Sequence, residues 1–78
     1  MRNLIKKHIS RNELQQLVVG SVWKVDVEEE ITLDIRYEGM SDTKLNFVSI
    51  DDNYPYVFQL TRKETLSRIW NISKGKRY

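Results

Sequence analysis

The stretch Ile31–Glu38, which reads ITLDIRYE, decides the fold. Its odd-numbered residues are all apolar and its even-numbered residues are all polar, so the pattern repeats every two residues. This period is typical of an antiparallel strand that has one face on a core and the other face toward solvent. We therefore expect Leu33 and Ile35 to lie in the core. The outward side chains of this strand would be Asp34, Arg36 and Glu38.

Three further segments are expected to join this strand in an antiparallel meander. They alternate between apolar and polar residues over 22–27, 45–50 and 56–61. Turn-forming residues separate the four strands at 28–30, 39–42 and 51–53. In the third strand the apolar positions shift from Phe47 to Val48, so we expect a β-bulge near Val48 to restore the register.

Two capping boxes predict a helix on each side of the meander. They are Ser10–Glu13 and Thr61–Glu64, in which a hydroxyl accepts from a backbone N–H and the glutamate reaches back to the cap residue. Apolar residues at helical spacing then predict one short helix over 11–19, ended by Gly20, and a second helix over 62–71.

The C-terminal segment has a second interpretation. Residues 62–67 could form a loop and residues 68–72 a fifth strand, with Trp70 and Ile72 facing inward. The expected class is α+β: a short N-terminal helix, a four-stranded antiparallel β-meander and a C-terminal helix. The alternative is a helix followed by a small five-stranded Sm-like β-barrel.

The composition indicates one small domain. The chain has 78 residues, of which 40% are hydrophobic and 31% charged, and we expect a single domain over 1–78 with flexible basic tails at 1–9 and 73–78. With no cysteine, and no apolar run long enough for a signal peptide or a membrane span, we expect a cytoplasmic protein without a membrane partner. The absence of alanine beside seven lysines and seven isoleucines indicates AT-rich coding, as in a phage or mobile element.

Charge is distributed unevenly along the chain. Residues 1–20 carry four basic residues and one acidic, residues 21–60 three basic and nine acidic, and residues 61–78 six basic and one acidic. Basic ends are compatible with binding to nucleic acid. The candidate nucleic-acid contacts are Lys6, Lys7, Arg11, Arg62, Lys63, Arg68, Lys74, Lys76 and Arg77.

Catalysis is not expected. His8 is the one histidine, and the three glycines are isolated, so the chain offers neither a catalytic triad nor a glycine-rich phosphate loop. The acidic run Glu28–Glu30 lacks the spacing of a calcium loop and is interpreted as a solvated turn. We predict no enzyme activity, no cofactor and no metal.

The leading hypothesis is a small regulatory or inhibitory protein that binds a larger protein and occludes its surface. The candidate protein contacts are Asp34, Arg36, Glu38, Tyr54 and Trp70. Trp70 is open to two interpretations, because it could be an exposed anchor among basic residues or could pin the second helix to the sheet. The alternative function is a nucleic-acid-binding module, and a third is a nucleotide sponge with a pocket between subunits. The oligomeric state is left open.

Overall fold

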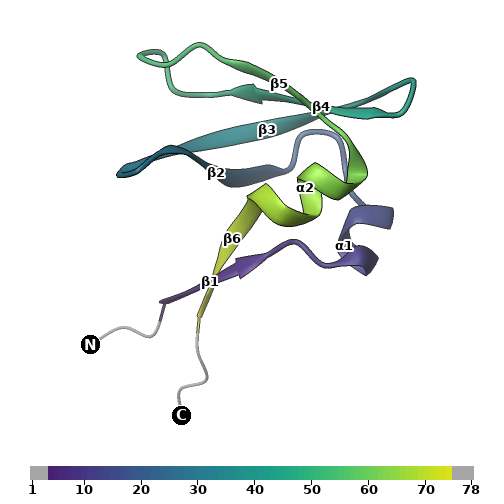
Figure 1. Cartoon of the computed structure of the whole chain (residues 1–78), viewed down its shortest axis with the longest axis horizontal. Coiled ribbons are helices and arrows are strands. Elements are labelled where there is room, and N and C mark those ends of the chain that lie inside the picture. Colours follow the sequence, from purple (N-terminus) through teal and green to yellow (C-terminus); the bar gives the residue numbers. More distant parts are fainter. Residues whose placement is uncertain (1–3, 75–78) are drawn as a thin grey trace.

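The computed structural model describes residues 4–74 and has the α+β class expected from the sequence (Figure 1). Six antiparallel strands form one open sheet in the order β1-β6-β2-β3-β4-β5. The elements are β1 (Leu4–His8), α1 (Arg11–Gln15), β2 (Val22–Glu28), β3 (Ile31–Ser41), β4 (Lys44–Ser49), β5 (Val57–Leu60), α2 (Arg62–Arg68) and β6 (Ile69–Lys74). The predicted meander is present as β2–β5, but it belongs to a larger sheet. The closed barrel is not seen in the part of the chain that the structure describes.

The bulge lies on β3, not on β4 as expected. The β3–β4 register shifts between Tyr37 and Gly39, so Glu38 is the extra residue, and Gly39 takes a positive φ of 111°. The turn predicted at 39–42 is correspondingly shorter, since β3 continues to Ser41. In β4, Phe47 is fully buried while Val48 lies on the other face, paired with Arg36. Strand β4 therefore alternates without interruption.

The segment expected to be an N-terminal tail is largely part of the sheet. Residues Leu4–His8 form β1, which pairs with β6 over five residue pairs, and the two strands extend together away from the meander (Figure 1). Ile9 follows as a core residue that is 3% exposed, and its N–H donates to the carbonyl of Ile69 at 2.9 Å. Residues 1–3 and 75–78, which belong to the expected tails, lie outside the described residues.

The C-terminal segment contains both a helix and a strand, so each of its two interpretations is correct in part. Helix α2 ends at Arg68, and Ile69, which is fully buried, begins β6. Strand β6 pairs with β2 through Lys24–Trp70 and Val25–Ile69. Since Val25 and Ile69 point inward, Trp70 points outward, and Ile72 is exposed. The expectation that Trp70 and Ile72 face the core is therefore wrong.

Both capping boxes are confirmed. The Ser10 hydroxyl accepts from the Glu13 N–H at 3.1 Å and the Thr61 hydroxyl accepts from the Glu64 N–H at 3.1 Å, while each glutamate accepts from the N–H of its cap residue at 2.9 Å. Helix α1, however, stops at Gln15 rather than at residue 19. Gly20 lies in the connection that follows, where its N–H donates to the Tyr37 carbonyl. The expected stop at Gly20 is wrong because the helix has already ended.

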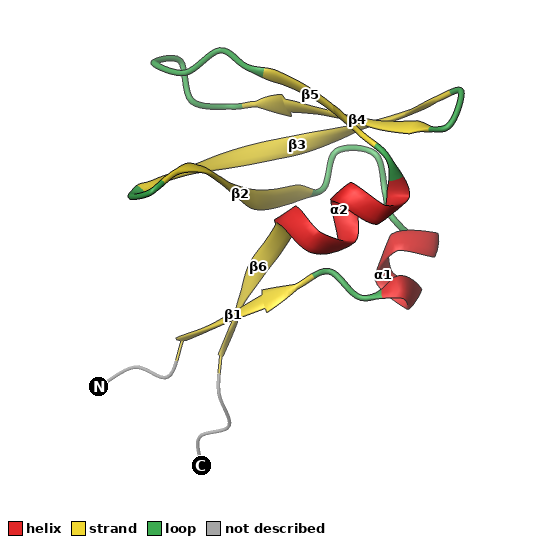
Figure 2. Cartoon of the chain, viewed as in Figure 1, coloured by secondary structure: helices red, strands yellow, loops and turns green. Residues whose placement is uncertain are grey.

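The core lies between one face of the sheet and the two helices (Figure 2). We call this sheet face the inner face. Its buried hydrophobic residues, with Ile9, are Val25, Leu33, Ile35, Tyr37, Leu45, Phe47, Leu60 and Ile69. Leu14 and Leu17 of the α1 region and Leu66 of α2 pack against them. Among the described residues, no helix is long and apolar enough to cross a membrane.

Candidate protein-binding face

The opposite side of the sheet, which we call the outer face, carries aliphatic side chains that are exposed or half-buried. The strand registers place Val22 opposite Arg36, Arg36 opposite Val48, and Val48 opposite Val57. Residues paired in this way have their Cβ atoms about 5 Å apart on the same face, so Val48 and Val57 are neighbours on β4 and β5, and Arg36 of β3 lies between them and Val22 of β2. Val22 is 46% exposed and Val57 69% exposed.

Ile50 extends this set of side chains at the end of β4. Its N–H donates to the Asp34 carbonyl at 3.0 Å, which continues the β3–β4 register by one position beyond the end of β4. The Ile50 side chain is 45% exposed. We define the aliphatic row as Val22, Val48, Ile50 and Val57. It is an unusual surface for the solvent side of an antiparallel sheet, where polar residues are the rule.

Three pairs of oppositely charged side chains form ion pairs on the outer face. Lys24 Nζ lies 2.6 Å from the Asp34 carboxylate, and Arg36 Nε lies 2.5 Å from the Glu38 carboxylate. A third pair joins Lys6 of β1 to Asp26 of β2 at 2.5 Å. The outer face is thus an apolar row beside charges that neutralise one another.

Trp70 lies next to the ion pair between Lys6 and Asp26. Lys6 Nζ sits 4.7 Å from the centroid of the Trp70 ring, close enough for a cation–π interaction. The Lys6 ammonium, which hydrogen-bonds the Asp26 carboxylate, lowers the pKa of Asp26, and the Thr32 hydroxyl lowers it further. The Trp70 indole N–H is buried and makes no hydrogen bond with another described residue.

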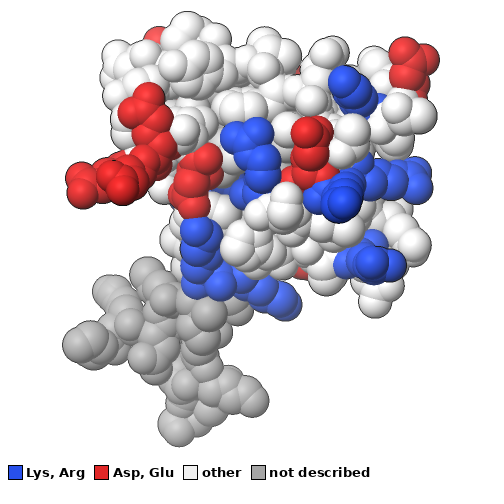
Figure 3. Space-filling model, in the orientation of Figure 1, with Lys and Arg blue, Asp and Glu red and all other residues white. Residues whose placement is uncertain are grey.

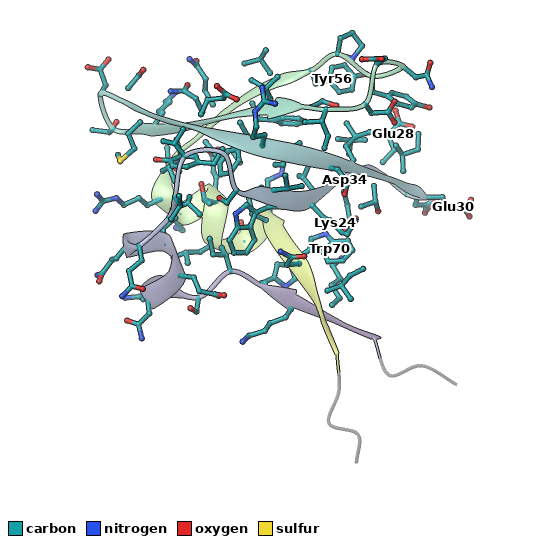
Figure 4. All side chains as sticks on the ribbon, turned by 180° about the vertical axis from the view of Figure 1, so that it is seen from behind. Lys24, Glu28, Glu30, Asp34, Tyr56 and Trp70 are labelled. Atoms are coloured by element: carbon teal, nitrogen blue, oxygen red, sulfur yellow. The ribbon has the colours of Figure 1, made fainter. Side chains whose placement is uncertain are left out.

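Four of the five predicted protein contacts share the outer face. Asp34, Arg36, Glu38 and Trp70 lie there, and Figure 4 shows Lys24, Asp34 and Trp70 side by side on neighbouring strands. Trp70 does not pin the second helix to the sheet, and its cationic neighbours are Lys6 and Lys24 rather than residues of α2.

Tyr54 is the predicted contact that lies elsewhere. It packs against the core from the inner side, with its ring centroid 6.4 Å from that of Tyr56. Tyr56 is 48% exposed, and Phe58 is half-buried under the Arg68 guanidinium, 5.8 Å from its ring centroid. Trp23, Tyr37 and Phe47 pack in or against the core.

The sequence interpretation missed the aliphatic row. The sequence pattern attributes the apolar Val48 to a β-bulge, whereas the structure places it at an outward position of a regular strand. The signal that identifies the row is an apolar residue at an outward position of the two strands that flank β3, Val22 in β2 and Val48 in β4, and of β5 beyond them, where it is Val57.

The predicted nucleic-acid contacts fall into separate groups. Arg11, Arg62, Lys63 and Arg68 lie on the two helices, and Figure 3 shows basic side chains gathered over this part of the molecule and acidic ones at the β2–β3 turn. Lys6 is paired with Asp26 on the outer face, and Lys7 is exposed on β1. Lys74 ends β6, while Lys76 and Arg77 lie outside the described residues.

Two further observations bear on function. Residues 4–74 contain no group of three or more acidic, histidine or cysteine side chains arranged to hold a metal ion. Comparison with protein-family models, with curated proteins and with solved structures found no significant match.

Proposed function

We propose that this chain is a small non-catalytic regulatory protein that binds a partner protein through its outer face and thereby covers the partner's surface. The observation that supports this proposal is the aliphatic row, in which Val22, Ile50 and Val57 are each more than 40% exposed although the protein has a well-packed core beneath them. Contiguous exposed apolar patches on a small domain are typical of protein interaction sites.

The charges of the outer face favour a partner surface that is apolar and nearly neutral. Lys24, Arg36 and Lys6 already have carboxylate partners at 2.5–2.6 Å. A nucleic acid would have to displace these carboxylates before its phosphates could reach the cations, and it would leave the aliphatic row against water. A protein surface with apolar side chains can cover the row while the ion pairs remain at the rim.

The test is a matched pair of aspartate substitutions. Val57→Asp places a carboxylate in the aliphatic row, and Val18→Asp places one at a valine of nearly equal exposure, 66% against 69%, in the connection after α1. An aspartate in an apolar interface must be desolvated without a partner, so we expect Val57→Asp to weaken binding at least about tenfold. Val18→Asp should bind as the unaltered protein does.

Binding is measured first by quantitative capture from a lysate of the source organism and then with the purified partner that differs between the two variants. Equal capture by both variants would contradict the proposal. Light scattering on the purified protein supplies a second check, since a dimer that Val57→Asp dissociates would mean that the row binds another copy of this chain. Capture of nucleic acid that Val57→Asp leaves intact, but that falls steeply with salt, would favour the nucleic-acid alternative.

A further inference from the structure

A groove lies on the helical side of the molecule, opposite the outer face. It runs between α1 and α2 above the ends of β3 and β4 and has a volume of about 430 Å³. Its apolar lining comes mainly from Leu14, Leu17, Tyr37, Leu45 and Leu66. This volume is within the range of about 300–1,000 Å³ that holds a small ligand or a few side chains.

Two arginines flank this apolar lining. Arg11 is the first residue of α1 and Arg62 the first residue of α2, so the fold brings together basic residues that are 51 positions apart in the sequence. Neither arginine forms an ion pair with another described residue. The groove has no acidic residue in its lining.

The acidic side chains of the two helices, Glu13 and Glu64, already accept hydrogen bonds at their own helix caps. The Glu13 carboxylate accepts from the Ser10 N–H and the Glu64 carboxylate accepts from the Thr61 N–H, each at 2.9 Å. Both glutamates therefore face their own helix caps, and the positive charge of the arginines is left for a ligand. An apolar lining beside unpaired guanidinium groups is complementary to an apolar group that has carboxylates next to it.

We propose that this groove binds a short acidic segment of a partner protein, in which an apolar side chain enters the groove and flanking carboxylates reach Arg11 and Arg62. This second site does not depend on the outer face, because it lies on the other side of the sheet.

The chain itself offers no suitable occupant. Its end segments outside the described structure, residues 1–3 and 75–78, contain basic residues and no acidic ones, so they carry charge of the same sign as the arginines of the groove. The acidic β2–β3 turn of a second copy has Glu28–Glu30 in succession with no apolar side chain among them (Figure 4). Val27 and Ile31, which flank this turn, pack against their own core.

The test uses a fluorescein-labelled, C-terminally amidated peptide of sequence Glu-Leu-Glu-Phe-Glu-Leu as the probe. Binding is followed by fluorescence anisotropy, and the site is located from NMR shifts of the Leu14 and Leu66 methyl groups. Two control peptides separate the contribution of the carboxylates from that of the apolar side chains. One has glutamine in place of every glutamate, and the other has serine in place of every apolar residue. We expect the probe to bind at least about tenfold more tightly than either control.

A matched pair of variants tests the role of the arginines. Arg11→Glu with Arg62→Glu reverses the two charges at the groove, and Lys63→Glu with Arg68→Glu makes the same change in net charge on α2 outside its lining. Arg11 and Arg62 are exposed in first helical turns, where a glutamate is well tolerated, so the protein should stay folded. We expect the first variant to lose at least about tenfold in peptide affinity and the second to lose less than about threefold. Val57→Asp should leave this affinity unchanged, which distinguishes this site from the outer face.

Several results would overturn the proposal. If the glutamine peptide bound as tightly as the probe, the carboxylates would have no role in binding. Equal losses of peptide affinity in the two charge variants would show that net charge rather than the groove attracts the probe. Decanoate binding that shifts the same methyl groups and displaces the probe at an equal concentration would make the groove a small-molecule site. A single-stranded oligonucleotide that binds more tightly than the peptide, and that needs Arg11 and Arg62, would make this surface a nucleic-acid site.

Discussion

Both faces of the sheet carry aliphatic side chains, but the side chains of one face are buried and most of those on the other are exposed. On the inner face Leu33 is 1% exposed and Phe47 is fully buried beneath the helices. On the outer face Val22 and Val57 also lie on paired strands, opposite Arg36 and Val48 respectively, yet they are 46% and 69% exposed. The comparison shows that an apolar residue on a strand does not by itself indicate the core: on one face it is buried and contributes to the free energy of folding, and on the other it remains exposed to solvent.

The largest expected effect concerns the inner face. Leu33→Ala removes buried side-chain atoms from the core and leaves a cavity, so it should cost about 3–5 kcal/mol of the free energy of unfolding. Since small domains have about 5–15 kcal/mol in total, this variant is expected to be close to unfolding. Val57→Ala, at an exposed site on the outer face, should cost less than about 0.5 kcal/mol. Urea denaturation of both variants provides the comparison, and similar losses would show that the two faces have been assigned wrongly.

The second prediction asks whether the N-terminal segment belongs to the folded unit. Ile9→Ala should lower the free energy of unfolding by about 2–4 kcal/mol, because Ile9 is a core residue directly after β1. If residues 1–9 were a flexible tail, this change would leave the free energy of unfolding unaltered. The matched control is Ile72→Ala, at a position in β6 that is 43% exposed, and we expect a loss below about 1 kcal/mol there. Urea denaturation midpoints that are the same for both variants would contradict the structural role of β1.

The sequence predicts those parts of the fold that depend on local pattern. The alternation of Ile31–Glu38 and the two capping boxes need no distant partner, and the structure confirms all three. Strand β1 could not be predicted in this way, because LIKKH has no period of two and is fixed by its pairing with β6, about 66 residues away in sequence on average.

The same reasoning explains the outcome at the candidate site. Asp34, Arg36 and Glu38 could be predicted as outward residues because their strand alternates cleanly. The aliphatic row was missed because apolar residues at outward positions look like a register error unless the partner strands are known. The groove at Arg11 and Arg62 depends on how α1 and α2 approach one another, which no local pattern specifies.

The third prediction concerns the helix caps on the inner side. Ser10→Ala and Thr61→Ala should each cost about 1 kcal/mol, since each leaves a helix-start N–H without its acceptor. Ser67→Ala is the control on α2, because its hydroxyl donates to a carbonyl within the helix and does not cap it. Thermal or urea denaturation should show a loss for the cap variants and none for the control. A loss of equal size at Ser67 would argue against a specific capping effect.

The smallest effect is a dependence of stability on pH. Backbone hydrogen bonds from Ser10 and Thr61 lower the pKa of Glu13 and Glu64 below the ordinary value of a glutamate. A carboxyl whose pKa is lower in the folded state stabilises the fold above its unfolded pKa, and this contribution is lost as the pH falls through the folded pKa. We therefore expect stability to decline on acidification, and Glu13→Gln with Glu64→Gln to make that decline shallower. NMR titration of both carboxyl groups checks the cause, and pKa values at or above those of an unfolded glutamate would contradict it.

The most direct test of the central claim is the accessibility of the outward methyl groups with and without the partner. A soluble paramagnetic agent broadens methyl signals in proportion to their exposure, and Val18 provides an internal reference on the helical side. We predict strong broadening at Val22, Ile50 and Val57 in the free protein and its loss in the complex, while Val18 remains broadened in both. Broadening at Val22, Ile50 and Val57 that persists in the complex would contradict the account.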